Sequence, residues 1–332
     1  MPRTGIFLLG IVALTAAAPR QAQSQDWTQR EYPLAPTNSK DNFVAPYFDG
    51  YYENEDGTYT LSFGFMNRND EELIEIPLGE NNFIEPAQYD GLQPTSFPAV
   101  SYPGFGGPRE RGAFGIVVPA DFEGDVWWTL TTDGYTTKVP GRIHAPERVI
   151  SFESAYAFST TPQAEGSLRP TLTFTEGGEP YWGIDGIRDP DHYTTKVGEP
   201  IEVEMWAWDR GERELKDVNV TLWKFQGPVG SNVMFESELP EPPEGTGARR
   251  GGGFSFGGGS PTLYGPGSAD IGQSIRVPTQ GPSANKLTFS AAFDTPGEYV
   301  VRVRVDNFTS GDSAAGNNCC WSNGYVNVTV TE

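Results

Sequence analysis

The alternation of apolar and polar residues with a period of two is the feature that most constrains the fold of this 332-residue chain. Successive side chains of a β-strand point to opposite faces, so this alternation is typical of strands that have one face in a core. The pattern recurs from "TYTLSFGFMN" near residue 60 to "GYVNVTV" near the end of the chain. No window combines apolar residues three and four apart with helix caps, and prolines punctuate the first half too often for helices. The sequence therefore predicts an all-β protein.

The same alternation predicts which side chains face a core. "EDGT" (55–58) separates two such runs in the first half, which predicts a hairpin. In the second half we expect strands at about 200–208 and 217–225 and three more near the C-terminus. Their inward sets are predicted to be Ile201, Val203, Met205 and Ala207; Val218, Val220 and Leu222; Leu287, Phe289, Ala291 and Phe293; Tyr299, Val301, Val303 and Val305; and Val326, Val328 and Val330. Short strands with turn signals between them favour an antiparallel sandwich.

Three segments carry a family resemblance. "VGEPIEVEMWAWD", "VTLWKFQGPVGSNVMF" and "FDTPGEYVVRVRVDN" resemble the strand pattern of secreted PKD-like, immunoglobulin-like domains over residues 195–331. The aspartate-glycine turn common in PKD domains is absent after Trp223. The first half resembles such a sandwich less closely, and the chain also resembles secreted bacterial proteins that end in a similar Cys-Cys-Trp motif. The resemblance implies two tandem immunoglobulin-like antiparallel β-sandwich domains and implies no activity, because such sandwiches host many unrelated roles.

Composition indicates how the chain is divided. Arg3 precedes an apolar run that is too short to span a bilayer, and Ala22-Gln23-Ser24 offers a cleavage site, so the N-terminus is predicted to be a secretory signal peptide. The expected parts are a signal peptide (1–24), an N-terminal sandwich (25–145), a connecting segment (146–195) and a C-terminal sandwich (196–332) with a Gly/Pro-rich insertion (237–284).

The insertion has few apolar residues, and this composition favours a mobile surface loop. The alternative is a flap that orders over a partner through Phe254, Phe256 and Tyr264.

Net charge bears on location and partners. A formal charge of −21 repels phosphate backbones and anionic lipid heads, so nucleic acid and membrane surfaces are poor partners. No later apolar run is long enough to insert into a membrane. We expect a secreted or periplasmic protein, and the sequence leaves its oligomeric state open.

Cys319 and Cys320 are the only two cysteines, and they are adjacent. An exported chain meets oxidants, which favours a disulfide between them, although their Cα atoms would be closer than in most disulfides. A buried reduced pair and intermolecular bridges are the alternatives. A disulfide here would stiffen a loop tip and, together with Trp321, present a rigid apolar surface.

Catalytic signatures are sparse. The two histidines, His144 and His192, are expected in loops, and no Gly-x-Ser-x-Gly or His-Glu-x-x-His motif is present. "GIDGIRDPDHY" places Asp185, Asp189 and Asp191 on one loop, and oxygen ligands of this kind suit calcium.

Aromatic side chains on presumed outer faces are the more informative feature. If the inward sets are right, Trp206 and Trp208 face away from the core, as does Trp223. Such aromatics mark an interface or a ligand platform, or they are covered by another part of the chain. We therefore expect a non-catalytic binding or structural protein that recognises a polysaccharide or a cell-surface protein through Trp206, Trp208, Trp223 and Trp321. The alternatives are an extracellular hydrolase or its accessory module, calcium-assisted through the aspartate loop, and an assembly subunit.

Overall fold

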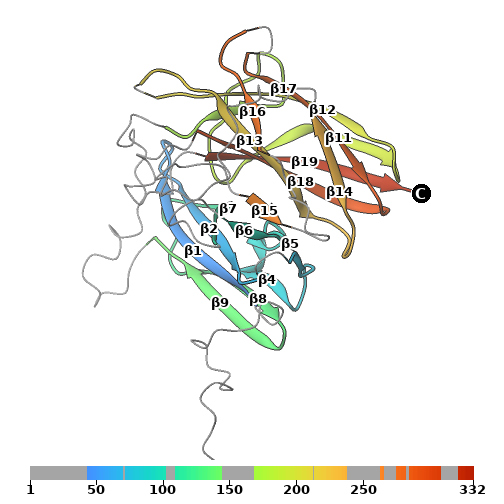
Figure 1. The fold of residues 1–332 in the computed structure, drawn as a ribbon. Helices are drawn as coiled ribbons and strands as arrows, with labels where there is room; N and C mark the ends of the chain where they lie inside the picture. The colour runs from blue at the N-terminus through green and yellow to red at the C-terminus, as the bar shows by residue number, and fades with distance from the viewer. Residues whose placement is uncertain are drawn as a thin grey trace, which may run out of the picture. The chain divides into compact units, whose positions relative to one another are not determined.

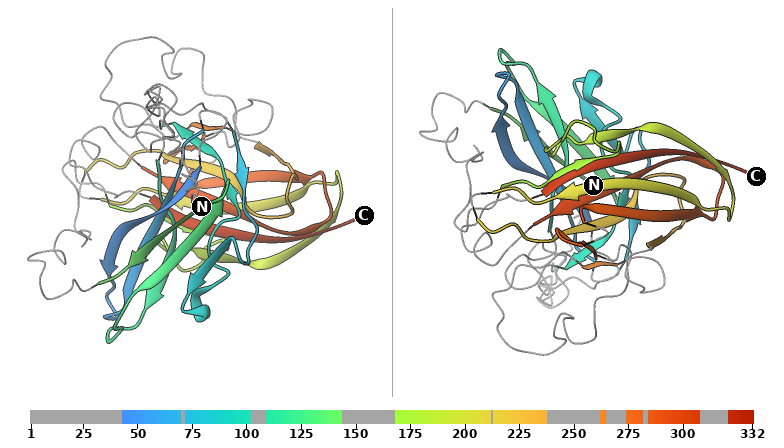
Figure 2. Two further views of the ribbon diagram at one scale, coloured as in Figure 1. Left: turned by 90° about the horizontal axis from the view of Figure 1, so that it is seen from below. Right: turned by 90° about the horizontal axis from the view of Figure 1, so that it is seen from above.

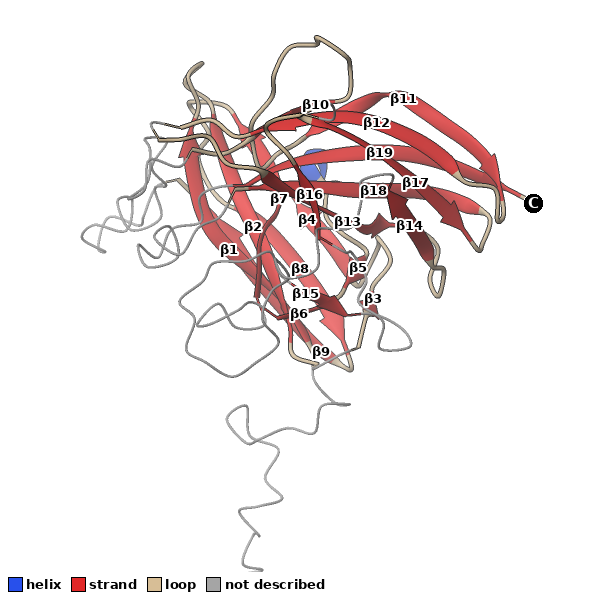
Figure 3. Cartoon of the chain, turned by 45° about the horizontal axis from the view of Figure 1, so that its top comes forward, coloured by secondary structure: helices blue, strands red, loops and turns tan. Residues whose placement is uncertain are grey.

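The computed structural model describes residues 43–69, 72–101, 109–143, 168–211, 213–237, 262–264, 274–281, 284–307 and 321–332. All of these residues belong to one compact unit, Asn38–Glu332. Strands dominate these ranges, in which the short 3-10 turn η3 (Ala87–Tyr89) is the one helical element (Figure 3). No helix in this part of the chain has the length and apolar character needed to cross a membrane. The predicted all-β fold is confirmed, while the predicted signal peptide lies outside the described residues.

The first half contains two three-stranded antiparallel sheets and one small sheet, and it shares a second small sheet with residues 262–264 (Figure 1). The first sheet has the order β1-β2-β7, with β1 at Val44–Glu53, β2 at Tyr59–Asn67 and β7 at Arg109–Val118. The second has the order β4-β8-β9, with β4 at Asn82–Glu85, β8 at Val126–Thr132 and β9 at Tyr135–Gly141. The small sheets pair β3 (Ile74–Glu75) with β5 (Ser96–Phe97) and β6 (Ala99–Ser101) with β15 (Thr262–Tyr264). The predicted hairpin is confirmed, since β1 and β2 pair on either side of the turn at 54–58.

The second half contains a four-stranded and a five-stranded sheet. The four-stranded sheet has the order β10-β12-β17-β14, with β10 at Thr171–Thr173, β12 at Ile201–Trp208, β17 at Lys286–Phe293 and β14 at Val233–Ser237. The five-stranded sheet has the order β11-β19-β18-β13-β16, with β11 at Ile187–Lys196, β19 at Trp321–Thr331, β18 at Gly297–Asp306, β13 at Val218–Gln226 and β16 at Ser274–Val277. β18 and β19 pair along their length, from Gly297 opposite Val330 to Asp306 opposite Trp321, and Figure 2 shows the strands of the structure from below and from above. β11 pairs with β19 in parallel, whereas the other pairs are antiparallel.

The two sheets of the second half face each other across one core. Every member of the five predicted inward sets is buried there, from Ile201 on β12 to Val330 on β19. The prediction succeeded because the period of two is set by the pleat of each strand and needs no knowledge of distant contacts.

Two segments that were expected to be a connection and a loop contribute strands to these sheets. Residues 146–195, expected to connect two domains, supply β10 and nearly all of β11. The expectation of a loop over 237–284 is wrong for β15 and β16, which pair with β6 and β13. Composition predicts whether a segment can build its own core, but a short strand can instead hydrogen-bond to an existing sheet. Phe254 and Phe256 lie outside the described residues, and the division into domains stays a prediction.

Candidate functional site

Large side chains fill the junction between the β1-β2-β7 sheet and the outer face of the five-stranded sheet. Trp223 and Phe225 on β13 and Tyr325 on β19 point away from the second core and are buried in the core of the first half. The exposed fraction of Trp223 is only 1%. Of the two readings of these outward aromatics, cover by another part of the chain is therefore the one that the structure supports.

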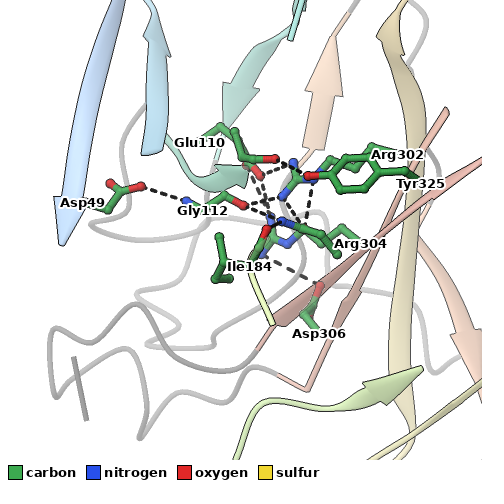
Figure 4. A network of polar contacts seen from close by, with 10 residues as sticks. Asp49, Glu110, Gly112, Ile184, Arg302, Arg304, Asp306 and Tyr325 are labelled. Atoms are coloured by element: carbon green, nitrogen blue, oxygen red, sulfur yellow. Dashed lines mark hydrogen bonds and ion pairs between the residues drawn. The ribbon is translucent and has the colours of Figure 1, made fainter. Parts of the chain in front are cut away.

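A buried ion network lies beside these rings (Figure 4). Arg302 and Arg304, both on β18, form ion pairs with Glu110 on β7 at 2.9 and 3.3 Å. The Arg302 guanidinium also donates to the carbonyl oxygen of Gly112 at 2.7 Å and stacks on Trp223 at 4.1 Å from the ring centroid. Burying charges is costly unless they are paired and hydrogen-bonded. A shift of the first half relative to the second would break these ion pairs, so the network fixes how the two halves are aligned.

Asn323 on β19 connects this network to the loop between β10 and β11. Its side-chain oxygen accepts from Nε of Arg302 at 3.0 Å, and its side-chain nitrogen donates to the carbonyl oxygen of Ile184 at 2.6 Å. The loop in turn packs tightly on β7. A Cβ added at Gly115 would lie 2.6 Å from the backbone nitrogen of Asp185, so only glycine allows this approach.

The loop closes one wall of a pocket of about 250 Å³, here called the junction pocket. It is lined by Tyr89, Leu92, Phe114, Gly115, Val117, Asp185, Arg188 and Tyr325. These residues come from η3 and the loop after it, from β7, from the β10–β11 loop, and from β11 and β19. Sites for drug-sized ligands usually enclose about 300–1,000 Å³, so this pocket suits a ligand of about one ring.

Asp185 supplies the carboxyl group of the pocket. Burial raises its pKa above the ordinary value, and the hydrogen bond from the Tyr181 hydroxyl and the nearby Arg169 oppose this shift only in part. Burial, reinforced by Asp185, also raises the pKa of Tyr181. Tyr181 therefore stays a donor to Asp185. A protonated carboxyl could itself donate to a ligand oxygen, and an ionised one could accept from a hydroxyl.

The lining of the pocket also includes a cation and aromatic side chains. The exposed Arg188 has its guanidinium 5.5 Å from the ring centroid of Tyr325 and donates to Asn327 at 3.1 Å. Tyr89 and Leu92 are positioned because the side chain of Gln226 on β13 donates to the loop carbonyls that follow them. Phe114 and Tyr325 are only 1% and 4% exposed, so Tyr89, which is partly buried, is the aromatic residue of the lining that can offer its ring to a ligand. The pocket thus combines one such ring with one acidic and one basic group, an arrangement that suits a small polyhydroxylated ring.

The tryptophans that were predicted as contacts separate into two pairs. Trp223 and Trp321 are 1% and 3% exposed, which leaves no area for contact with a partner. Trp206 and Trp208 lie on the outer face of β12 and are partly buried, and Lys286 lies 5.5 Å from the ring centroid of Trp206. These two remain available as contacts.

The aspartates predicted for calcium do not form a cluster. Asp189 is buried and accepts from the Tyr193 hydroxyl at 3.1 Å and from the backbone nitrogen of Asp191 at 3.0 Å, whereas Asp185 faces the junction pocket. Within the described ranges, no group of three or more His, Cys, Asp or Glu side chains is placed to hold a metal ion. Cys319 and Cys320 lie outside the described residues, so their disulfide stays a prediction.

Sequence reasoning missed most of the pocket. Tyr89, Phe114 and Arg188 carry no local signal, because the residues that line the pocket come together only when strands far apart in sequence pack. Asp185 was singled out, but for a different chemistry.

No protein-family model matches the chain, and no curated protein matches it. Among solved structures, the chain is similar to the Yersinia pseudotuberculosis adhesin InvE, with 9% sequence identity and a TM-score of 0.22. The match covers 88% of this chain and 59% of that one, so this chain spans less than two thirds of the adhesin chain. A likeness at that TM-score carries no argument about fold or function, and membership of the PKD-like family stays a prediction.

Proposed function

We propose that the chain is an exported, non-catalytic binding protein that recognises a carbohydrate, and that the junction pocket holds one sugar ring. The observation that carries the proposal is the pairing of the partly buried Tyr89 ring with a half-buried carboxyl group in a pocket of about 250 Å³. Sugar rings present apolar faces for stacking and hydroxyls that exchange hydrogen bonds with Asp185 and Arg188. The strongly acidic composition argues against nucleic acid as the partner.

The strand order supports the immunoglobulin-like part of the proposal for the second half. A four-stranded sheet packed on a larger one resembles that architecture. One feature differs from it: β14, on the four-stranded sheet, precedes β16, on the other sheet, along the chain.

A hydrolase is the second candidate, and the lining of the pocket argues against it. Glycoside hydrolysis commonly uses two carboxyl groups about 5–9.5 Å apart on either side of the scissile bond. Asp185 is the one carboxyl-bearing residue among the described residues that line the pocket. Binding without turnover is the better fit.

The proposal is tested by isothermal titration of the purified mature protein with a panel of neutral oligosaccharides, such as xylotetraose, cellotetraose and mannotetraose. At least one should bind, and Tyr89→Ala should weaken its binding about tenfold, or about 1.4 kcal/mol, because a stacking face is lost. Tyr135→Ala is the matched control, since Tyr135 is 55% exposed and does not line the pocket. Absence of binding across the panel, or equal affinity for the Tyr89 variant, would contradict the proposal.

Two further parts of the proposal have their own readouts. Trp206 and Trp208 are proposed as a second contact surface, so Trp208→Ala should abolish binding to the longer polysaccharide without unfolding the protein. Export predicts that protein recovered from culture medium begins near Gln25, which N-terminal sequencing checks.

A further inference from the structure

Two arginines lie next to each other beside the loop that carries Asp185. Arg169 precedes β10, and Arg210 follows β12 on the neighbouring strand. The backbone nitrogen of Leu168 donates to the carbonyl oxygen of Arg210 at 3.3 Å, and Nε of Arg210 donates to the carbonyl oxygen of Arg169 at 2.7 Å. These bonds extend the β10–β12 pairing and hold the two side chains at one end of the sheet.

Each of the two guanidinium groups stacks on an aromatic ring. Arg169 lies 4.1 Å from the ring centroid of Tyr52, and Arg210 lies 4.0 Å from that of Trp182. Tyr52 is buried, whereas Trp182 is 36% exposed. A stacked guanidinium is fixed in orientation and keeps N–H groups along its rim, which can bind a planar anion through two parallel hydrogen bonds.

No ion pair within the described ranges joins either arginine to a carboxylate. Asp209 is adjacent in sequence but is engaged elsewhere, since it accepts from Arg213 at 2.6 Å and from the backbone nitrogen of Lys216 at 2.8 Å. Burial and then the charge of Arg169 lower the pKa of Arg210, and the exposed Glu55 opposes this shift more weakly. The pair is therefore a local site of positive potential in a chain of charge −21.

We propose that Arg169 and Arg210, with Trp182 beside them, bind a single carboxylate or sulfate group of the ligand. A polyanion is disfavoured, because the whole chain would repel its other charges. The ligand class is an otherwise neutral oligosaccharide that carries one acidic group. Arg210 stacks on Trp182, which lies on the same loop as Asp185, so the anion site is close to the junction pocket. Arg169 also acts electrostatically on Asp185 and Tyr181. The carbohydrate nature of the ligand rests on the proposed function, whereas the anion site does not.

The first test uses small anions alone. Malonate and sulfate are titrated into the mature protein against chloride at constant ionic strength, and binding is followed through the Nε–H signals of arginine side chains by NMR. Saturable shifts of two such signals are expected, and Arg169→Gln and Arg210→Gln should each abolish saturation. Arg68→Gln is the matched control, since Arg68 also stacks on a ring, that of Phe43, but lies at the other end of the β1–β2 pair. Linear shifts that are equal in all variants would overturn the anion site.

The second test compares matched sugars by titration calorimetry. The affinity for xylotetraose is compared with the affinity for xylotetraose that carries one glucuronic acid branch. The affinity for galactose is compared with the affinities for galactose 6-sulfate and galacturonic acid, which shows whether the anion that binds is a sulfate or a carboxylate. The acidic form should bind about tenfold more tightly than the neutral form, and Arg210→Lys should lose most of this preference because an ammonium lacks the planar fork. Equal affinity of neutral and acidic forms would refute the inference while leaving the proposed function intact. Binding of malonate or sulfate without binding of any sugar would refute the proposed function instead.

Discussion

Glu110→Gln is the substitution that tests the junction most directly. Its carboxylate is fully buried and neutralises two arginines that are themselves at most 2% exposed, at 2.9 and 3.3 Å. Glutamine keeps the shape and much of the hydrogen-bonding capacity but removes the charge. Among the described residues, Asp306, 4.0 Å from Arg304, then remains as a carboxylate paired with these arginines.

The magnitude follows from the cost of an uncompensated buried charge. Removing the carboxylate of Glu110 makes this buried cluster more positive by one unit charge while it stays out of water. Breaking a buried pair by removing one partner costs about 3–5 kcal/mol of unfolding free energy. For a unit of this size that corresponds to a fall in Tm of about 6–20 °C.

The assay is urea denaturation followed by tryptophan fluorescence. Trp223 and Trp321 report on the junction, because their ring centroids lie 4.1 Å from Arg302 and 4.9 Å from Arg304. Glu204→Gln is the control, since its pair with Lys286 is about half exposed and should contribute no more than about 1 kcal/mol. A loss below about 1 kcal/mol for Glu110→Gln would refute the reasoning.

Three further predictions concern the pocket and the two cores. Burial raises the pKa of Asp185, so the folded state holds the carboxyl proton more tightly than the unfolded chain does. The free energy of unfolding should therefore fall as the pH rises from 3.8 through the raised pKa. Asp185→Asn should remove this fall, which is measured as Tm between pH 3 and 8. Gly112→Ala should lower the free energy of unfolding by about 1–3 kcal/mol in denaturation experiments, because φ is +54° and the new Cβ would overlap the Trp321 indole. Gly134→Ala is the control for the backbone strain alone, since Gly134 has φ +77° and lies in open space. Phe289→Ala should cost about 3–5 kcal/mol by the same assay, since the ring is buried between the two sheets of the second half.

The sequence predicts the strands and their inward faces because both depend on local alternation. In "EYVVRVRVDN" the valines at odd positions are correctly predicted to face the core. The same rule places Arg302 and Arg304 on the opposite face, where charged residues usually meet solvent. Their burial could not be predicted, because it depends on Glu110, almost two hundred residues earlier in the chain.

The pocket was unpredictable for a similar reason. Asp185 stands in an acidic loop, and acidity alone suggests a cation site. Asp185 lines a pocket because Gly115 on β7 lets its loop approach that strand closely. Phe114 and Tyr325 line the same pocket. Each of these residues is ordinary within its own strand, and only the packing of the two halves makes them a site.

The ion network and the pocket are also mechanically connected, which gives the Glu110 variant a second readout. Asn323 holds Arg302 with its oxygen and the loop carbonyl of Ile184 with its nitrogen. When Arg302 loses its ion pair with Glu110, the guanidinium is held less firmly, the amide of Asn323 that bonds to it is held less firmly too, and the wall that carries Asp185 loosens. Under conditions where Glu110→Gln is still folded, its affinity for the pocket ligand should therefore fall, while that of Glu204→Gln should not. A destabilised variant that binds as tightly as the wild-type protein would mean that the junction only stabilises the fold and does not shape the pocket.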